Sequence, residues 1–365
     1  MLKLIIKSLY ILHLNVIVYY LLEQFFHKSI KYRENDMDDA RNLLESLSPN
    51  PDNSCIREEE SKLMRLYDLQ VIVPAYKTAN TIKGCIDSVL NQHTQYKILI
   101  TVVNDGSPDN MDEVLREYEE NERVEIINQE NKGLSGARNR GLDVIKADYV
   151  TFLDSDDEFL PNTLDAMLKQ AKMADADLIE GGYIMFNKAG DKRTIRHKYN
   201  LHGGKLYGFP WGKLFKAQLF KNIKFPEGFW FEDTLMAFVI YSFCRKVVTS
   251  DVLFYHYRLN PNGITATAVK NKKVIDTYWI TENLLEDRRR FGLTNHDFAM
   301  TMLDQIRTNY KRIRGLNHDD ADKAVFILTI ALWKTYFHDC QTNSPLQKAL
   351  ENNDFKAYRL ICELT

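Results

Sequence analysis

Cysteines, net charge and long hydrophobic runs are all scarce in this sequence of 365 residues. The five cysteines contain no Cys-x-x-Cys pair, which excludes the usual zinc and dithiol redox motifs and indicates reduced thiols in a cytoplasmic protein. The net charge is −2, with 48 Lys and Arg against 50 Asp and Glu, so we expect no nucleic-acid partner. No uninterrupted apolar run reaches the roughly 20 residues of a transmembrane helix. The hydrophobic content of 45% is typical of a globular protein, and the length allows two or three domains.

The first 66 residues divide into an apolar and a polar part. Residues 1–30 are predicted to form an apolar helix, and Lys3, Lys7, His13 and Asn15 interrupt its first 26 residues. This helix either lies on a membrane surface, at the inner face of the cell membrane, or packs on its own protein or a partner. Residues 31–66 are rich in charge and proline and are predicted to be a linker.

Short apolar segments alternate with helical periodicity after the linker. The predicted strands cover residues 69–73, 98–103, 124–127 and 149–153, and the predicted helices lie at 79–91, around 114–118 and at 135–144. This order predicts an α/β domain over residues 67–265 with a mostly parallel, doubly wound sheet, whose ligand binds beyond the carboxyl ends of the strands. Residues 266–365 are predicted to form a helical C-terminal region.

An acidic cluster, Asp154-Ser155-Asp156-Asp157, follows the last of these strands. Three carboxylates in four residues repel one another unless a cation neutralises them, so Mn²⁺ or Mg²⁺ is a natural ligand. The alternative is a solvated turn whose carboxylates cap the following helix. On its own, the cluster leaves both interpretations open.

Three further clusters could carry chemistry. Asn104 and Asp105 end a predicted strand, where an acid could accept hydrogen bonds from a ribose or base; the alternative, which local grounds favour, is a turn that starts the next helix. Residues 131–141 combine three glycines with three cations, including Arg138, at a predicted helix start, which suits a phosphate; the alternative is glycines that allow close packing beside exposed cations. Glu232 and Asp233 lie among aromatic residues and are either a helix cap or a general base beside a sugar platform.

The order of these clusters resembles glycosyltransferase family 2, in particular bacterial surface-polysaccharide glycosyltransferases. The resemblance covers about residues 69–265. The matching motifs are Val71-Ile72-Val73-Pro74-Ala75-Tyr76, Ser88-Val89-Leu90-Asn91-Gln92, Asn104-Asp105-Gly106-Ser107, residues 131–141, Asp154-Ser155-Asp156-Asp157, Trp211-Gly212-Lys213-Leu214-Phe215, Phe225-Pro226-Glu227-Gly228, Glu232-Asp233-Thr234 and Tyr255-His256-Tyr257-Arg258.

The resemblance implies a GT-A type fold and a metal-dependent hexosyltransferase with Mn²⁺ or Mg²⁺ as cofactor. It implies inverting transfer of a sugar from a nucleotide-sugar donor, usually a UDP-sugar, to a glycan or lipid-linked acceptor. Carried over by position, the resemblance implies that Pro74, Ala75 and Tyr76 lie in the uridine pocket, Asn104 and Asp105 near the base, and Arg138 at the base and diphosphate. It implies that Asp154, Ser155 and Asp156 form the DxD motif, with Asp156 on the metal and His256 near it. It also implies that Asp233 is the catalytic base and that Glu232, Trp211 and Trp230 lie in the acceptor site.

Two positions depart from the family's pattern. Asn104 stands where the family often has Asp, and Lys77 stands where Asn is common, so these departures bear on donor choice and remove no catalytic group. An alternative function is a non-catalytic, transferase-like scaffold that gathers the enzymes of a glycan assembly complex through its terminal helices.

Overall fold

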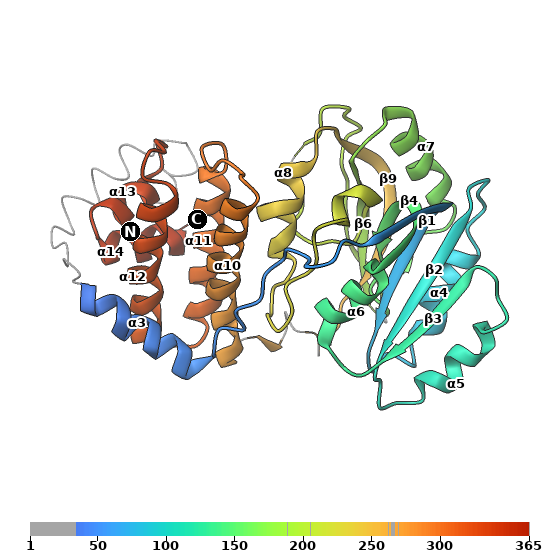
Figure 1. Ribbon diagram of the computed structural model, residues 1–365, viewed down its shortest axis with the longest axis horizontal. Helices are drawn as coiled ribbons and strands as arrows, with labels where there is room; N and C mark the ends of the chain where they lie inside the picture. The colour runs from blue at the N-terminus through green and yellow to red at the C-terminus, as the bar shows by residue number, and fades with distance from the viewer. Residues whose placement is uncertain are drawn as a thin grey trace. The chain divides into compact units, whose positions relative to one another are not determined.

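The computed structural model describes residues 34–364, apart from positions 188, 205, 262, 264–266 and 269. These residues form two compact units. The first comprises Asn53–Gly228 and Glu232–Pro261 and contains the sheet, whereas the second comprises the described residues up to Asp52, the segment Phe229–Phe231 and the described residues from position 263 onward (Figure 1). The predicted helix at residues 1–30 lies outside the described residues.

The first unit is built on one sheet, in which nine strands can be traced over the described residues. Their order is β3-β2-β1-β4-β8-β6-β9-β5, with β7 paired to β6. The strands are β1 (Lys62–Ala75), β2 (Ile98–Asp105), β3 (Val124–Gln129), β4 (Val144–Phe152), β5 (Glu158–Phe159), β6 (Leu178–Asn187), β7 (Gly190–Ile195), β8 (Lys213–Lys216) and β9 (Val247–Arg258). β1 runs parallel to β2 and β4, and β2 parallel to β3, whereas β8 is antiparallel to both of its neighbours (Figure 1). The predicted α/β fold with a mostly parallel sheet is confirmed.

Helices cover both faces of the parallel strands because successive side chains of a buried strand point to opposite faces. Leu69, Val71 and Val73 of β1 pack in one core with α4 (Ile82–Leu90), α5 (Met111–Leu115) and α7 (Leu164–Ala174). The residues between them face α6 (Gly133–Leu142): Gln70 Nε2 donates to Gly141 O at 3.3 Å. Gly141 has no room for a side chain, since a Cβ there would lie 2.6 Å from Ile72.

Short helical turns complete the connections between strands. η1 (Arg116–Tyr118) follows α5 between β2 and β3, whereas η2 (Ala217–Phe220), the π-helical turn η3 (Met236–Ile240) and α8 (Tyr241–Phe243) lie between β8 and β9. The sequence predicts no strand between residues 185 and 258. β8 has four residues, too few for a periodic signal, and the helical turn η2 follows it directly.

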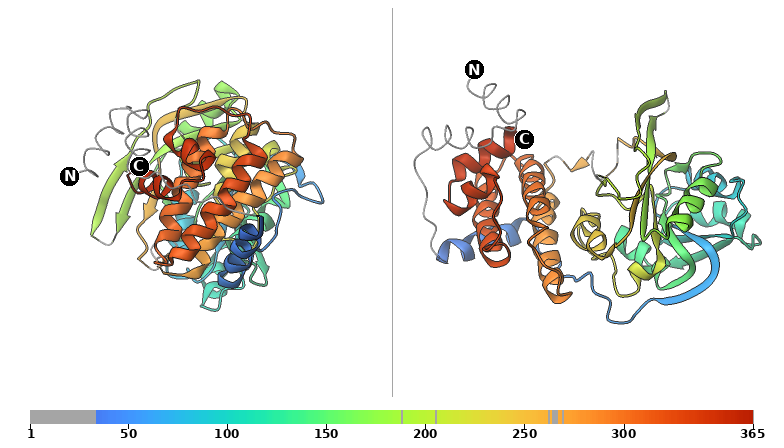
Figure 2. Two further views of the ribbon diagram at one scale, coloured as in Figure 1. Left: turned by 90° about the vertical axis from the view of Figure 1, so that its left-hand side faces the viewer. Right: turned by 90° about the horizontal axis from the view of Figure 1, so that it is seen from above.

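The second unit is helical, as predicted for the C-terminal region. Its elements are α3 (Glu34–Leu47), η4 (Lys272–Ile275), α10 (Asp276–Arg290), α11 (Ala299–Arg314), α12 (Asp319–Tyr336), α13 (Pro345–Glu351) and α14 (Phe355–Leu364). Helix α3, blue in Figure 2, packs against α12. Its residues fall within the predicted polar linker, but Ala40 and Leu44 form a buried stripe at four-residue spacing. Because this stripe is narrow, the composition of the segment remains polar, and the sequence predicts a linker.

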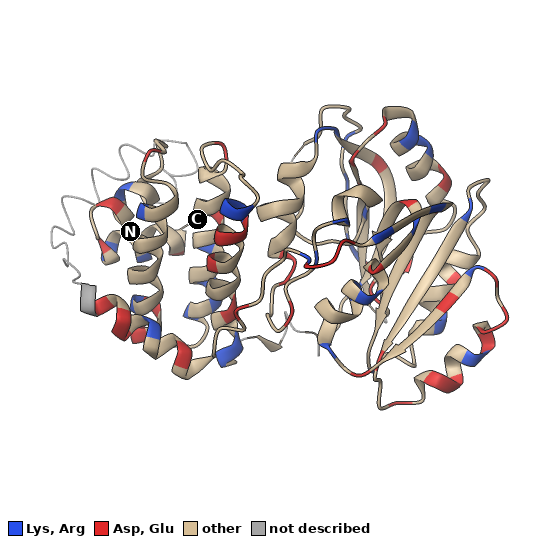
Figure 3. Cartoon of the chain, viewed as in Figure 1, with Lys and Arg blue, Asp and Glu red and all other residues tan. Residues whose placement is uncertain are grey.

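Charges of both signs are interspersed over the strands and helices (Figure 3). Within the described ranges, no helix has the length and apolar character needed to cross a membrane.

Candidate active site

The loops that follow β1, β2 and β4 meet at one edge of the sheet, because parallel strands end at the same edge. Thr78 donates from Oγ1 to Ser155 Oγ at 2.9 Å, which joins the loop after β1 to the acidic loop after β4. Lys77 N donates to Ser107 Oγ at 2.7 Å and joins the loops after β1 and β2. The structure therefore brings the loop after β1 together with two of the clusters that the sequence predicts.

The predicted uridine pocket begins at the end of β1. Pro74 and Ala75 are buried in the sheet, whereas the side chain of Tyr76 is 42% exposed. The Lys77 ammonium lies 5.0 Å from the centre of the Tyr76 ring. Of the three residues predicted here, Tyr76 is the one that offers an exposed ring to a ligand.

Asn104 and Asp105 face inward and shape the neighbouring loops. Asn104 Nδ2 donates to Asp112 Oδ1 at 2.8 Å and to Asn128 Oδ1 at 3.1 Å. Asp105 Oδ1 accepts from Gln129 Nε2 at 2.6 Å and from Lys132 N, just before α6, at 2.8 Å. Both predicted base-binding residues thus anchor the site, and their contact with a base stays a prediction.

Arg138, on α6, is the central charged group of the site. Its guanidinium donates through NH2 to Asp154 Oδ1 at 2.9 Å and through NH1 to Glu232 Oε1 at 2.6 Å, and the residue is only 2% exposed. The two carboxylates raise the pKa of Arg138, which burial alone would lower. A single cation therefore joins the acidic loop to the predicted catalytic pair.

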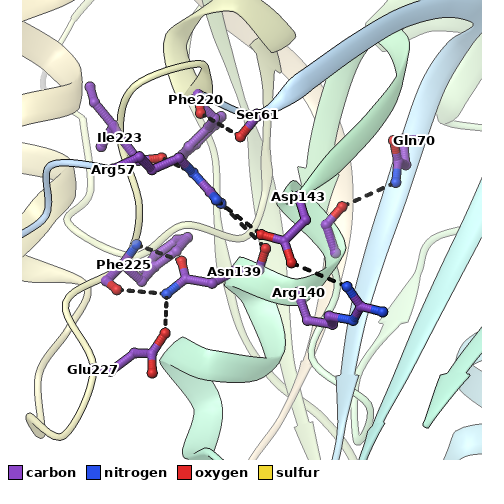
Figure 4. A network of polar contacts seen from close by, with 11 residues as sticks. Arg57, Ser61, Gln70, Asn139, Arg140, Asp143, Phe220, Ile223, Phe225 and Glu227 are labelled. Carbon is purple, nitrogen blue, oxygen red and sulfur yellow. Dashed lines mark hydrogen bonds and ion pairs between the residues drawn. The ribbon is translucent and has the colours of Figure 1, made fainter. Parts of the chain in front are cut away.

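The second half of α6 is held in place by a network that begins before β1 (Figure 4). Arg57 donates to Asp143 Oδ1 at 3.0 Å, to Asn139 O at 3.3 Å and to Ile223 O at 3.2 Å. The Asn139 side chain in turn donates to Phe225 O at 2.8 Å and accepts from Phe225 N at 2.7 Å. This network fixes the helix that carries Arg138.

The acidic loop contains more negative charge than the protein neutralises. Asp154 pairs with Arg138, but burial and the charge of Asp154 raise the pKa of Asp156, and the same causes raise that of Asp157 further. Asp156 Oδ2 accepts from the neutral Asn260 Nδ2 at 3.2 Å, and Arg258, which donates to Asp156 O at 2.7 Å, offsets only part of the rise in pKa. Such a loop suits a cation.

His256 lies on β9 with its ring stacked on Phe186, at 3.7 Å between centroids. Its Nε2 is 3.1 Å from Asp191 Oδ1, and its Nδ1 is 3.9 Å from Glu158 Oε2. The partners of His256 are thus Phe186, Asp191 and Glu158, and none of these contacts involves Asp156. Metal binding by His256 stays a prediction. Over the described ranges, no group of three or more His, Cys, Asp or Glu side chains is arranged to hold a metal ion by itself.

Trp211 belongs to a stack of aromatic rings. It is 7% exposed and lies parallel to Phe209, at 3.6 Å between centroids, and to Tyr255, at 4.5 Å. Tyr183 packs edge-on against Trp211 at 5.1 Å. A ring this covered leaves little surface for a sugar, so its predicted role in the acceptor site has weak geometric support.

The predicted catalytic pair begins a helical segment. Glu232 is buried against Arg138, and Asp233 O accepts from Met236 N at 2.9 Å in the first turn. Trp230 belongs to the helical unit, where its backbone N donates to Asp276 Oδ2 at 2.8 Å.

The sequence of this region matches the family model described as Glycosyl transferase family 2 over residues 70–232. Residues 70–232 belong to glycosyltransferase family 2. Glycosyltransferase GlyA of Streptococcus pneumoniae is 34% identical over 218 residues, and the match covers 54% of this chain but only 31% of GlyA. Glycosyltransferase GlyG of the same organism is 29% identical over 221 residues, or 54% of this chain and 73% of GlyG.

A solved structure has a similar fold. S. aureus TarS 1-349, crystallised with UDP-GlcNAc, aligns with a TM-score of 0.54 and 18% identity over 81% of this chain and 90% of TarS 1-349. At this identity the similarity concerns the fold alone. Together with the sheet topology, it confirms the predicted GT-A type architecture.

The family 2 domain contains a buried ion pair whose partner in β6 the sequence analysis missed. Lys213 of β8 and Glu180 of β6 are 0% and 1% exposed, with Lys213 Nζ 3.6 Å from Glu180 Oε1. Lys213 Nζ also donates to Phe209 O at 2.7 Å, and Glu180 accepts from Tyr207 N at 3.2 Å. Burial lowers the pKa of Lys213, whereas the charges of Glu180 and Asp233 act in the opposite direction. The pair therefore fixes the backbone of the segment that carries Tyr207 and Phe209, and it places a cation within electrostatic range of Asp233.

We expect Lys213→Met to destabilise the protein by about 3–5 kcal/mol, because it leaves the Glu180 carboxylate buried without its cation. The double variant Glu180→Gln/Lys213→Met removes both charges and is expected to recover part of this loss. Urea unfolding followed by circular dichroism measures both. The matched control is Lys221→Met, which breaks a surface pair with Glu60 and is expected to cost less than about 1 kcal/mol. Equal losses for Lys213→Met and Lys221→Met would contradict the assignment.

Proposed function

We propose that this protein is an inverting glycosyltransferase that moves a sugar from a UDP-sugar to a glycan or lipid-linked acceptor in cell-surface polysaccharide synthesis. The observation that carries the proposal is the Arg138 bridge, because it ties the acidic loop after β4 to the Glu232-Asp233 pair within a family 2 domain. Support for the donor comes from TarS, which shares the fold and binds UDP-GlcNAc and UDP in its crystals. A location at the inner face of the cell membrane would give access to lipid-linked acceptors.

Asp233 is the proposed general base. In an inverting transfer the acceptor hydroxyl attacks the anomeric carbon from the face opposite the leaving diphosphate, and its proton passes to a carboxylate. A positioned base contributes about 10²- to 10⁴-fold in rate. The side chain of Lys213 interacts electrostatically with Asp233.

The N-terminal part of α6 is the proposed site of the diphosphate. Ser135 Oγ and Arg138 Nε are buried and have no hydrogen-bond partner among the described residues. Buried polar atoms are rarely left unpaired, and both atoms can donate to phosphate oxygens. The guanidinium would also stabilise the negative charge that develops on the leaving group.

The residues of the acidic loop fit a divalent cation. Burial and the charge of Asp154 raise the pKa of Asp156, and a cation would stabilise its ionised form. Mg²⁺ in nucleotide sites is held by one or two carboxylates together with substrate phosphates. A single carboxylate of this loop, together with the phosphates of the donor, would therefore suffice to hold the cation. Mn²⁺ or Mg²⁺ on Asp156 would act as a Lewis acid towards the diphosphate when bound.

We expect Asp156→Ala to weaken UDP binding at least tenfold in the presence of Mn²⁺, because the cation that neutralises the diphosphate loses its protein ligand. Calorimetric titration of UDP with and without Mn²⁺ measures this on the folded variant. Asp251→Ala, which removes an exposed carboxylate, is the control and should bind UDP as the wild type does. Wild-type protein that binds no UDP under either condition would contradict the proposed donor.

We expect Asp233→Asn to reduce sugar transfer by about 10²-fold or more while the dissociation constant for UDP stays within a factor of about two, because the base acts on the acceptor. The assay follows UDP release from UDP-GlcNAc and other UDP-sugars with a cell-envelope extract as acceptor source. Asp251→Asn is the matched control. A folded Asp233→Asn protein that transfers sugar at the wild-type rate, or that loses UDP binding, would refute the role of Asp233.

A further inference from the structure

We propose that Tyr255 is a positioning residue that sets the acidic loop in the conformation needed to hold a divalent cation together with a nucleoside diphosphate. This inference rests on the proposed function, since it concerns the same donor site. It also assigns Trp211 a role different from the sugar platform predicted from sequence.

The hydroxyl group of Tyr255 joins both ends of the acidic loop. It accepts a hydrogen bond from Asp154 N at 3.1 Å and donates one to Asp157 Oδ2 at 2.8 Å. The other carboxylate oxygen of Asp157 accepts from Arg258 N at 2.6 Å. One phenol oxygen thus fixes the first residue of the loop through its backbone and the last through its side chain, which leaves Asp156 between two fixed points.

The loop needs such a fixed point because its carboxylates repel one another. Asp157 is 1% exposed, and Arg138 lies against Asp154 rather than Asp157. A hydrogen bond to a carboxylate is stronger than one between neutral groups, and more so away from water.

The Tyr255 ring is itself held by aromatic packing. It is 0% exposed, lies parallel to the Trp211 ring at 4.5 Å and meets the Phe159 ring edge-on at 6.0 Å. On the far side of this arrangement, Phe209 stacks on Trp211, and its carbonyl accepts from the buried Lys213 ammonium. Trp211 therefore acts through Tyr255: it fixes the ring that fixes the loop.

The test measures Mn²⁺ binding to UDP-saturated protein from the electron paramagnetic resonance signal of free Mn²⁺, with a thermal melt of each variant. We expect Tyr255→Phe, which removes a single oxygen, to weaken Mn²⁺ binding about 10- to 100-fold, the usual effect of losing a group that orients a metal ligand. Tyr118→Phe is the matched control. It removes the same atom from a buried tyrosine whose hydroxyl donates to the Asp87 carboxylate at 2.8 Å, and it should leave the Mn²⁺ affinity unchanged.

Trp211→Phe separates the two roles of Trp211, because UDP carries no sugar. A residue that acts through Tyr255 should weaken Mn²⁺ binding to the UDP complex severalfold, whereas a sugar platform should leave it unchanged. Tyr255→Phe protein with wild-type Mn²⁺ affinity would overturn this inference alone. Wild-type protein that binds neither UDP nor Mn²⁺ with UDP would overturn the proposed function and this inference with it.

Discussion

The candidate site depends on one buried guanidinium. Arg138 forms ion pairs with Asp154, which follows β4, and with Glu232, which lies 78 positions further along the chain, and all three charges are largely removed from water. Taking charges out of water costs several kcal/mol per ion, so the arrangement holds only because each carboxylate receives a direct hydrogen bond. Without the cation, two carboxylates would be left buried, and the loop after β4 would lose its link to the Glu232-Asp233 pair.

Successive layers of packing support this bridge. Helix α6 is fixed at its start by Asp105, which accepts from Lys132 N, and along its second half by the Arg57 and Asn139 network (Figure 4). On the other side of the acidic loop, Tyr255 is supported by stacked aromatic rings. Rigid support of this kind is what a transfer reaction needs, because a displacement of the charged groups by 1 Å can cost a hundredfold in rate.

Much of this arrangement could be predicted from the sequence, because buried parallel strands form apolar runs and their polar ends mark the ligand edge. The clusters at Asn104, Arg138 and Asp154 were placed correctly at that edge. The Arg138–Glu232 pairing could not be predicted, since local patterns carry no information on contacts across 94 positions. The Lys213–Glu180 pair was missed for a similar reason: a single Lys or Glu in a short strand is typical of an exposed surface.

The most direct test of the account is a double-mutant cycle on the free energy of unfolding, with Arg138→Met, Glu232→Gln and the combined variant. Residues in one buried ionic network show interaction energies of about 0.5–3 kcal/mol, and the bridge predicts a value in the upper half of that range. Arg138→Met alone should destabilise the protein strongly, and Glu232→Gln should offset part of that loss. Effects that add within about 0.5 kcal/mol would mean that the two side chains do not interact, and the central claim would fail.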